Sequence, residues 1–320
     1  MQAFVTGGSG FIGGRLIERL RSEGWQVCAL ARSTSSAEKV KAIGADPVEG
    51  DLEDADALRA GAEGCDVAFH AAAHLGEWGP RDDFMRINVE GTKNVLLACR
   101  EAGVRRIVHV GTEAALLVGQ PLVNADESVP LRPESKALYS ATKAMAEQAV
   151  RDANGNGLET VVVRPRLVWG RGDTTILPNL TEAVKSRRFA WIGGGRHRTS
   201  TTHVDNTVEG LMLGAEKGQP GGVYFVTDGE PVVFRDFITE LLATQGVEVP
   251  DRNMPAGLAK VAAAAAEGVW RVLPLKGTPP VTRIAVWLSS LECTIDTSHA
   301  QAELGYKPVK TIADGMEELR

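Results

Sequence analysis

Short apolar runs alternate with segments of helical periodicity through the first half of the chain. Each run is largely apolar at consecutive positions, and the runs lie at 3–5, 27–31, 67–70, 106–110 and 160–164. Between them, apolar residues recur every three or four positions, which predicts helices at 12–21, 53–62, 83–102 and 137–152. Strands that are apolar on both faces and separated by helices are typical of a parallel sheet covered on both sides. The pattern therefore predicts an α/β fold with a doubly wound parallel sheet.

This alternation weakens after Pro165. Glycine-rich stretches break the chain into shorter pieces, with one further strand expected at 223–226 and helices at 234–244 and 256–272. We therefore expect a smaller α-rich domain, partly interwoven with the sheet, that would bind the substrate. The expected boundaries are 1–165 plus about 197–228 for the sheet domain, and about 166–196 plus 229–320 for the smaller one.

The expected helix 256–272 has an unusual distribution of charge. Its charged residues, Lys260, Glu267 and Arg271, are seven and four positions apart and fall on one narrow stripe. The rest of its circumference is apolar, which predicts a helix buried on most sides. A lid over an apolar substrate and a contact with a membrane surface remain alternatives.

Composition excludes several classes of protein. The 320 residues carry a net charge of −6, whereas a protein that binds nucleic acid through its phosphates normally has a basic excess. Four cysteines far apart and histidines without ligand spacing predict neither a disulfide framework nor a metal site. Every 18-residue stretch contains a charge, so we expect no transmembrane segment. With no targeting signal recognised, a cytoplasmic protein is expected.

A glycine-rich loop separates the first strand from the first helix. It contains Gly7, Gly10 and Gly13, with Phe11 and Ile12 opening the helix. Glycines in this context allow a tight turn and a close approach of the backbone to a pyrophosphate, and the helix N-terminus offers free N–H groups to it. The loop therefore predicts a dinucleotide-binding sheet domain of the Rossmann type.

The end of the second strand bears on the choice of dinucleotide. Sites that prefer NAD usually place an acid there to bind the ribose hydroxyls, but this chain has Ala31 followed by Arg32. A guanidinium can bind a phosphate through two parallel hydrogen bonds. Arg32 therefore favours NADP(H), and NAD remains an alternative.

Three hydroxyl and amine groups form a candidate proton-transfer site. Tyr139 and Lys143 are four positions apart and share one face of a helix, while Thr112 follows a parallel strand at its carboxyl end. A free phenol has a pKa near 10, and a neighbouring cation lowers that pKa. We expect Tyr139 to exchange a proton with an alcohol oxygen, Thr112 to hold that oxygen, and Lys143 to lower the pKa of Tyr139.

These motifs, in this order, resemble those of the extended short-chain dehydrogenase/reductases over essentially the whole chain. The matching segments are TGGSGFIG (6–13), GDL (50–52), HAAA (70–73), NVEGTKN (88–94), YSATK (139–143), RPRLVWG (164–170) and HVDN (203–206). The resemblance implies that Asp51 and Leu52 flank the adenine and that Ala71 and Ala72 line the cofactor channel. It also implies that Lys143 binds the nicotinamide ribose, that Pro165 to Leu167 lie near the carboxamide, and that the protein is a homodimer.

Three shorter segments resemble those of one branch of this family, the 3β-hydroxysteroid dehydrogenases and the reductases of 2-alkyl-3-keto acids. They are GEWG (76–79), the Trp in RLVWG (166–170) and PPVTR (279–283). This branch implies NADP(H)-dependent interconversion of a secondary alcohol and a ketone on a hydrophobic, sterol-like or long-chain substrate. Two alternatives remain: an epimerase or dehydratase that recycles bound NAD on a nucleotide sugar, and a dinucleotide sensor without catalysis. Glu113, directly after Thr112, is interpreted as a loop carboxylate or as one that lies behind the reacting groups, and Arg166 as an ordinary ion-pair residue.

Overall fold

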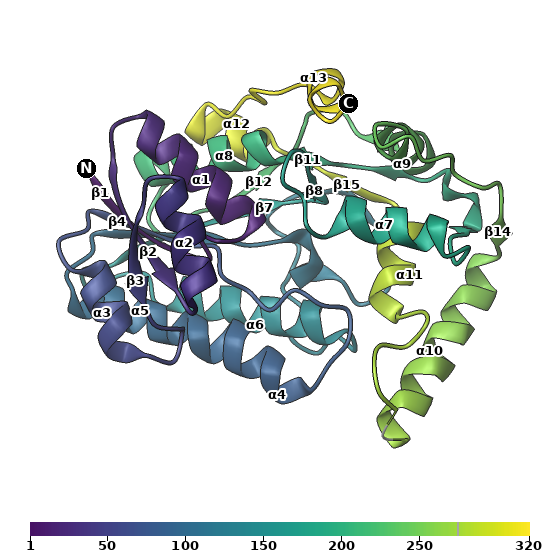
Figure 1. The fold of residues 1–320 in the computed structure, drawn as a ribbon, viewed down its shortest axis with the longest axis horizontal. Coiled ribbons are helices and arrows are strands. Elements are labelled where there is room, and N and C mark those ends of the chain that lie inside the picture. The colour runs from purple at the N-terminus through teal and green to yellow at the C-terminus, as the bar shows by residue number, and fades with distance from the viewer. Residues whose placement is uncertain (274) are drawn as a thin grey trace.

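Seven parallel strands form the central sheet of the computed structural model, which describes residues 1–273 and 275–320 (Figure 1). The strand order is β3-β2-β1-β4-β5-β7-β12. The strands are β1 (Gln2–Thr6), β2 (Gln26–Ala31), β3 (Asp46–Glu49), β4 (Val67–His70), β5 (Arg106–Val110), β7 (Glu159–Pro165) and β12 (Val223–Val226). The order reverses beside β1, so the crevice at the carboxyl ends of β1 and β4 is where such a sheet binds a ligand. This arrangement confirms the predicted doubly wound fold.

Helices cover both faces of the sheet, as the continuous apolar strands require. One face is covered by α1 (Phe11–Ser22), α2 (Thr34–Ala42), α8 (Val204–Lys217) and α12 (Ser298–Leu304). The other is covered by α3 (Ala55–Ala62), α5 (Gly91–Glu101) and α6 (Leu138–Asp152). The resulting two cores hold the sheet rigid, so that the loops at its carboxyl edge have a fixed support.

The expected helix at 83–102 is not continuous. It consists of α4 (Arg81–Phe84), a π-helical turn η1 (Met85–Glu90) and α5. Within the π-turn, the buried Asn88 side chain accepts from the His74 backbone N–H at 2.7 Å and donates to Thr142 Oγ1 at 3.1 Å. Through these two hydrogen bonds the side-chain amide of Asn88, in the π-helical turn, links the loop after β4 to α6.

The remaining elements pack against the carboxyl edge of the sheet. A four-stranded sheet has the order β13-β10-β15-β6 and contains parallel and antiparallel pairs. Its strands are β6 (Leu122–Ala125), β10 (Arg198–Thr199), β13 (Val232–Val233) and β15 (Cys293–Ile295). Four two-residue strands form two short pairs: β8 (Val168–Trp169) with β11 (Thr202–His203), and β9 (Trp191–Ile192) with β14 (Asn253–Met254). The helices here are α7 (Ile176–Lys185), α9 (Phe234–Ala243), α10 (Ala256–Val272), α11 (Arg283–Ser290) and α13 (Ile312–Glu318).

The expectation that 256–272 is buried on most sides is wrong. α10 has the predicted bounds, but it packs mainly on α11 through the small Ala259 and Ala263, together with Val286. Leu258 and Val261 are 60% and 67% exposed. An alanine-rich helix presents little bulk to its neighbour, so its larger apolar side chains can remain in solvent while the helix is still formed.

Candidate active site

The glycine loop is pressed between the end of β4 and the first turn of α1. Gly7 has a φ of 75°, and a Cβ there would lie 2.6 Å from the backbone N of Ala72. A Cβ on Gly13 would lie 2.2 Å from the carbonyl oxygen of Gly7. Both distances are too short for any side chain, so the loop can adopt this path only with glycine at these two positions.

The N-terminus of α1 presents unpaired backbone donors beside this loop. The helix begins at Phe11, its N-cap is Gly10, which has no side chain to act as a cap, and its first turn contains no acid. The backbone N–H groups of the first turn and the positive end of the helix dipole therefore suit a pyrophosphate. These residues fit a dinucleotide, and the tight cradle around Gly7 and Gly13 is the observation that supports this.

The other predicted cofactor residues lie along the same edge of the sheet. Arg32 follows β2 directly and is exposed, and Asp51 and Leu52 come after Gly50, the residue that follows β3. Ala71 follows β4 and donates its N–H to Thr6 O at 3.1 Å, and Ala72 comes next. Because β1 to β4 are parallel neighbours, all of these positions border the crevice beside the glycine loop.

Beyond β7, the backbone adopts a costly conformation. Pro165 ends the strand, and Leu167 has a φ of 46°, in the left-handed region that side chains other than glycine rarely occupy. Such a residue typically costs about 1–3 kcal/mol and clusters at functional sites. The Thr202 N–H holds the Leu167 carbonyl at 3.4 Å. Pro165 and Leu167 thus lie at the carboxyl edge of the sheet, where β7 ends.

Thr112, Tyr139 and Lys143 converge at the end of β5. Tyr139 lies in the first turn of α6, and Lys143 follows one turn later. The buried Lys143 Nζ donates to the carbonyl of Val110, the last residue of β5, at 2.9 Å. Thr112 lies two residues further on, close to the phenol of Tyr139. The structure thus brings together the three residues that sequence reasoning selected for proton transfer.

A buried ion pair lies directly behind this group. Glu113 and Arg166 are 3% and 2% exposed, and Arg166 Nη1 donates to Glu113 Oε1 at 2.6 Å. The other carboxylate oxygen, Oε2, accepts from the Thr112 hydroxyl at 2.9 Å. A carboxylate can only accept, so the proton of Thr112 points at Glu113, and the Thr112 oxygen itself accepts from the backbone N–H of Ala114 at 3.2 Å. Sequence reasoning expected an ordinary ion pair for Arg166, but it did not identify Glu113, 53 positions away, as the partner.

The ionisation of Tyr139 differs from the expectation. Burial raises the pKa of the Tyr139 phenol above its usual value near 10, and the negative charge of Glu113 raises it further. The neighbouring Thr112 hydroxyl has the opposite, smaller effect on this pKa. Lys143, whose ammonium donates to the Val110 carbonyl, is not among the groups that shift the pKa of this phenol. The phenol is therefore protonated at neutral pH.

Lys143 lies in a low-dielectric setting of its own. Burial lowers its pKa to about 8, and the carboxylate of Glu147, one turn along α6, opposes that effect. Glu147 is completely buried and pairs with Arg164 of β7. Gly111 lies against this pair, since a Cβ there would lie 3.0 Å from Arg164 Cγ and 2.8 Å from Val162 Cγ1. The packing explains why a glycine precedes Thr112 in place of a hydroxyl residue.

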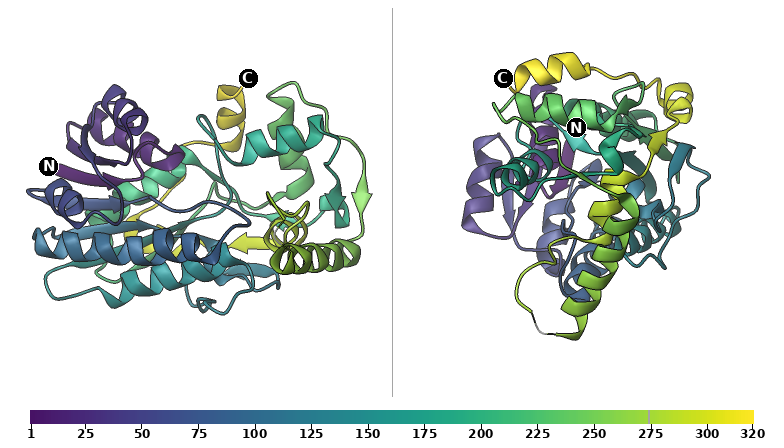
Figure 2. Two further views of the ribbon diagram at one scale, coloured as in Figure 1. Left: turned by 60° about the horizontal axis from the view of Figure 1, so that its bottom comes forward. Right: turned by 90° about the vertical axis from the view of Figure 1, so that its right-hand side faces the viewer.

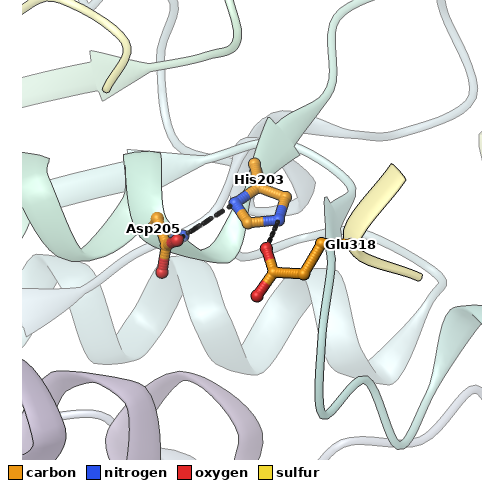
Figure 3. A group of neighbouring side chains, drawn as sticks. All are labelled: His203, Asp205 and Glu318. Carbon is orange, nitrogen blue, oxygen red and sulfur yellow. Dashed lines mark hydrogen bonds and ion pairs between the residues drawn. The ribbon is translucent and has the colours of Figure 1, made fainter. Parts of the chain in front are cut away.

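His203, Asp205 and Glu318 form a group with metal-ligand chemistry outside this site (Figure 3). His203 Nδ1 accepts from the Asp205 backbone N–H at 3.2 Å, and burial lowers the pKa of its ring. Arg15 donates to Asp205 at 2.5 Å, and Lys310 lies 3.3 Å from Glu318. Both carboxylates are already neutralised by cations. The cluster therefore links α13 to α8 and α1, and we assign it no metal.

The fold and this site together define a class. A doubly wound sheet whose first loop fits a dinucleotide, with a tyrosine and a lysine one helical turn apart at the carboxyl edge, is the arrangement of an extended short-chain dehydrogenase/reductase. The chain matches the model of the 3-beta hydroxysteroid dehydrogenase/isomerase family over residues 4–256, and it belongs to that family. It is an oxidoreductase that depends on a nicotinamide dinucleotide and acts on hydroxyl or keto groups. The family and branch predicted from the motifs are confirmed.

Relatives and solved structures agree with this placement. The chain is 48% identical to a 4-hydroxy-2-methyl-3-oxo-4-farnesyl-3,4-dihydroquinoline-1-oxide ketoreductase of Stigmatella aurantiaca, over 100% of this chain and 96% of that protein. It is 36% identical to a 2-alkyl-3-oxoalkanoate reductase of Stenotrophomonas maltophilia, over 100% and 98% of the two chains. Among solved structures, gox2253 has a TM-score of 0.79 and 29% identity, covering 99% of this chain and 97% of that one. DesIV, a dTDP-glucose 4,6-dehydratase of Streptomyces venezuelae with NAD bound, has a TM-score of 0.77 at 23% identity, covers 100% and 96% of the two chains, and shares the fold.

Proposed function

We propose that this protein reduces the ketone of a hydrophobic substrate to a secondary alcohol with NADPH. The proposal depends on one observation above all: Thr112, the partly buried Tyr139 and Lys143 lie together at the carboxyl edge of the sheet, where the pKa of the phenol is raised and the phenol is protonated. Both curated relatives described above are named as reductases of oxo compounds, one of them on a farnesyl-substituted ring. These names support a long-chain or ring-bearing ketone as the substrate class.

In this mechanism Tyr139 is the general acid. The reduced nicotinamide, when bound, would supply the hydride, and the phenol would give its proton to the carbonyl oxygen of the substrate as that oxygen becomes an alcohol. Burial and Glu113 favour the protonated phenol, which is the form needed for reduction. Thr112 lies beside the phenol and would help to hold the substrate oxygen there. Lys143, with N–H donors beyond the one given to Val110, would bind the ribose hydroxyls.

The preference for NADPH is argued from Arg32 and what surrounds it. Its side chain is exposed directly after β2, and the preceding Ala31 offers no carboxylate to bind a ribose hydroxyl. Ser33 caps the N-terminus of α2, so a helix dipole also points at this position. A 2′-phosphate here would meet a guanidinium and a helix N-terminus, both of which favour negative charge.

Incubation of the purified protein with a 2-alkyl-3-oxo acid tests the proposed activity. We expect NADPH to be consumed in step with the ketone, and Arg32→Ala to raise the KM for NADPH by about tenfold, the equivalent of about 1.4 kcal/mol, with NADH little affected. Absorbance of the reduced nicotinamide measures both. Turnover of a nucleotide sugar without net change in cofactor would instead establish the epimerase or dehydratase alternative.

Glu113 provides a test of the proposed acid through pH dependence. Since its charge raises the pKa of Tyr139, Glu113→Gln should lower that pKa, and the newly unpaired Arg166 should lower it further. Reduction needs the protonated phenol and is lost as pH rises through the pKa, so the alkaline limb of kcat should move to lower pH in the variant. Glu113→Asp keeps the charge and should keep the limb near its wild-type position. Thermal unfolding shows whether Glu113→Gln is folded. If the folded variant loses kcat at the same alkaline pH as the wild type, Glu113 does not have this electrostatic role.

A further inference from the structure

Two histidines are buried side by side beneath the candidate active site. His70 ends β4, His109 is the last residue but one of β5, and the two are in register across the sheet. Each is 1% exposed, and their ring centres are 5.2 Å apart. Ala68 and Ile107, two positions earlier in each strand, belong to the core under α5 and α6, which lie side by side (Figure 2). Because side chains alternate along a strand, both rings are on this same face.

The hydrogen bonds of His70 determine which of its ring nitrogens carries the proton. Thr92 of α5 donates its hydroxyl proton to Asn88 O at 2.6 Å, so its oxygen accepts from His70 Nε2 at 2.9 Å. His70 Nδ1 then accepts from the Thr6 hydroxyl at 2.6 Å. Burial and the charge of Lys143 lower the pKa of His70 to about 3, so the ring is neutral. His70 is thus hydrogen-bonded at both nitrogens and carries its proton on Nε2.

His109 has the opposite arrangement. Its Nε2 lies 3.4 Å from the Nζ of Lys143, the group that also donates to Val110 O at 2.9 Å. An ammonium can only donate, so Nε2 accepts and the ring proton is on Nδ1. Burial and the charge of Lys143 lower the pKa of His109 well below its usual value, which keeps Nε2 free of a proton.

The other nitrogen of His109 carries a cost. Its Nδ1–H is buried and has no hydrogen-bond partner among the residues that the structure describes. A buried donor without a partner destabilises the folded state, whereas an apolar side chain such as the buried Ile107 on the same face has no such group. Within the described part of the chain, the ring forms its hydrogen bond with Lys143. What the imidazole adds here is therefore an acceptor for that ammonium.

We propose that His109 is a positioning residue, whose Nε2 holds the ammonium of Lys143 in place for the dinucleotide. An ammonium has three N–H donors. Val110 O and His109 Nε2 take two of them, which leaves the third for the ribose hydroxyls, the role that rests on the proposed function. Both acceptors belong to consecutive residues of β5, which pairs with β4 on one side and β7 on the other. The strand therefore fixes the direction of the third donor.

Nitrogen NMR of the full chain, with isotope-labelled histidine, tests the assignment without substrate or dinucleotide. At neutral pH we expect both rings to be neutral, with the proton of His109 on Nδ1 and that of His70 on Nε2. The signals of each ring are identified by their loss in His109→Gln and in His70→Gln. A proton on Nε2 of His109, alone or in a doubly protonated ring, overturns the proposal, because this nitrogen could then accept nothing from Lys143.

Two amide variants test the positioning itself. Glutamine at position 109 places its amide where Nε2 lies, whereas the shorter asparagine reaches only the place of Nδ1. We expect His109→Asn to raise the Kd for the reduced dinucleotide about tenfold and to lower kcat, with the KM for the ketone unchanged. His109→Gln keeps an acceptor beside Lys143 and should bind the dinucleotide nearly as the wild type does. Fluorescence titration with NADPH, repeated with NADH, measures the Kd values.

Melting curves show whether the two variants fold, and the NMR of the wild type does not depend on them. A folded His109→Asn and a folded His109→Gln with equal Kd values overturn the proposal, since the reach of the side chain would then have no effect. A wild type that binds the dinucleotide but reduces no ketone contradicts the proposed function alone. In that case the dinucleotide Kd values and the position of the ring proton still decide the role of His109.

Discussion

Tyr139→Phe should lower kcat for ketone reduction by about 10²–10⁴-fold, the usual contribution of a positioned general acid. The substitution removes one oxygen and leaves the ring, which packs against the core that contains Phe225 and Ile284. The binding of the dinucleotide should be unchanged, because the glycine loop lies on other elements. Steady-state kinetics together with a dinucleotide titration measure the two effects separately.

The chain provides a matched control. Its other tyrosines are Tyr224 and Tyr306, and the hydroxyl of the buried Tyr306 donates to Thr227 O at 2.8 Å, away from the crevice. Tyr306→Phe deletes the same atom and should cost about 1 kcal/mol of stability with kcat unchanged. If instead the two variants retain equal turnover, Tyr139 is not the acid, and the alternative of a dinucleotide sensor without catalysis regains support.

Most of the central sheet could be predicted from the sequence because its strands are buried on both faces, which makes them continuously apolar. β3 could not, since it lies at the edge and consists of Asp46, Pro47, Val48 and Glu49. The π-helical turn at 85–90 could not be predicted from the sequence either, because a single extra residue in the turn leaves the spacing of the apolar residues nearly unchanged. Helices α2, α7, α8 and α11 to α13 lie outside the expected elements as well.

The exposure of α10 could not be predicted from the sequence for a different reason. Its apolar circumference is typical of a buried helix, but burial needs a neighbour on each side, and the structure provides mainly α11. The electrostatics of the active site share this dependence on tertiary contacts. The spacing of Tyr139 and Lys143 placed them correctly on one helix, whereas the pKa of the phenol depends on Glu113 and on depth of burial, neither of which spacing encodes.

Gly13→Ala should abolish tight dinucleotide binding, whereas Gly14→Ala, one residue on, should not. A Cβ on Gly13 would lie 2.2 Å from the Gly7 carbonyl oxygen and 2.7 Å from its carbon, and backbone cannot move aside as a side-chain tip can. Relief requires the loop to leave the helix N-terminus, which separates the donors that would bind the pyrophosphate. A loss of about 3 kcal/mol, at the upper end for overpacking, raises the dinucleotide Kd by about 100-fold.

At Gly14 the same added atom has room. Its Cβ would lie 3.4 Å from the Gly8 carbonyl oxygen, an ordinary contact, inside a helix where alanine is favoured over glycine by up to about 1 kcal/mol. Gly14→Ala should therefore bind the dinucleotide as the wild type does and melt at the same or a higher temperature. Fluorescence titration measures the dinucleotide Kd of the two variants, and thermal unfolding measures their stability. Together they separate the effect of the steric clash from the effect of helix propensity. If Gly13→Ala and Gly14→Ala bind the dinucleotide equally well, the contact between Gly13 and Gly7 does not shape the site. The dinucleotide would then bind elsewhere along the carboxyl edge of the sheet.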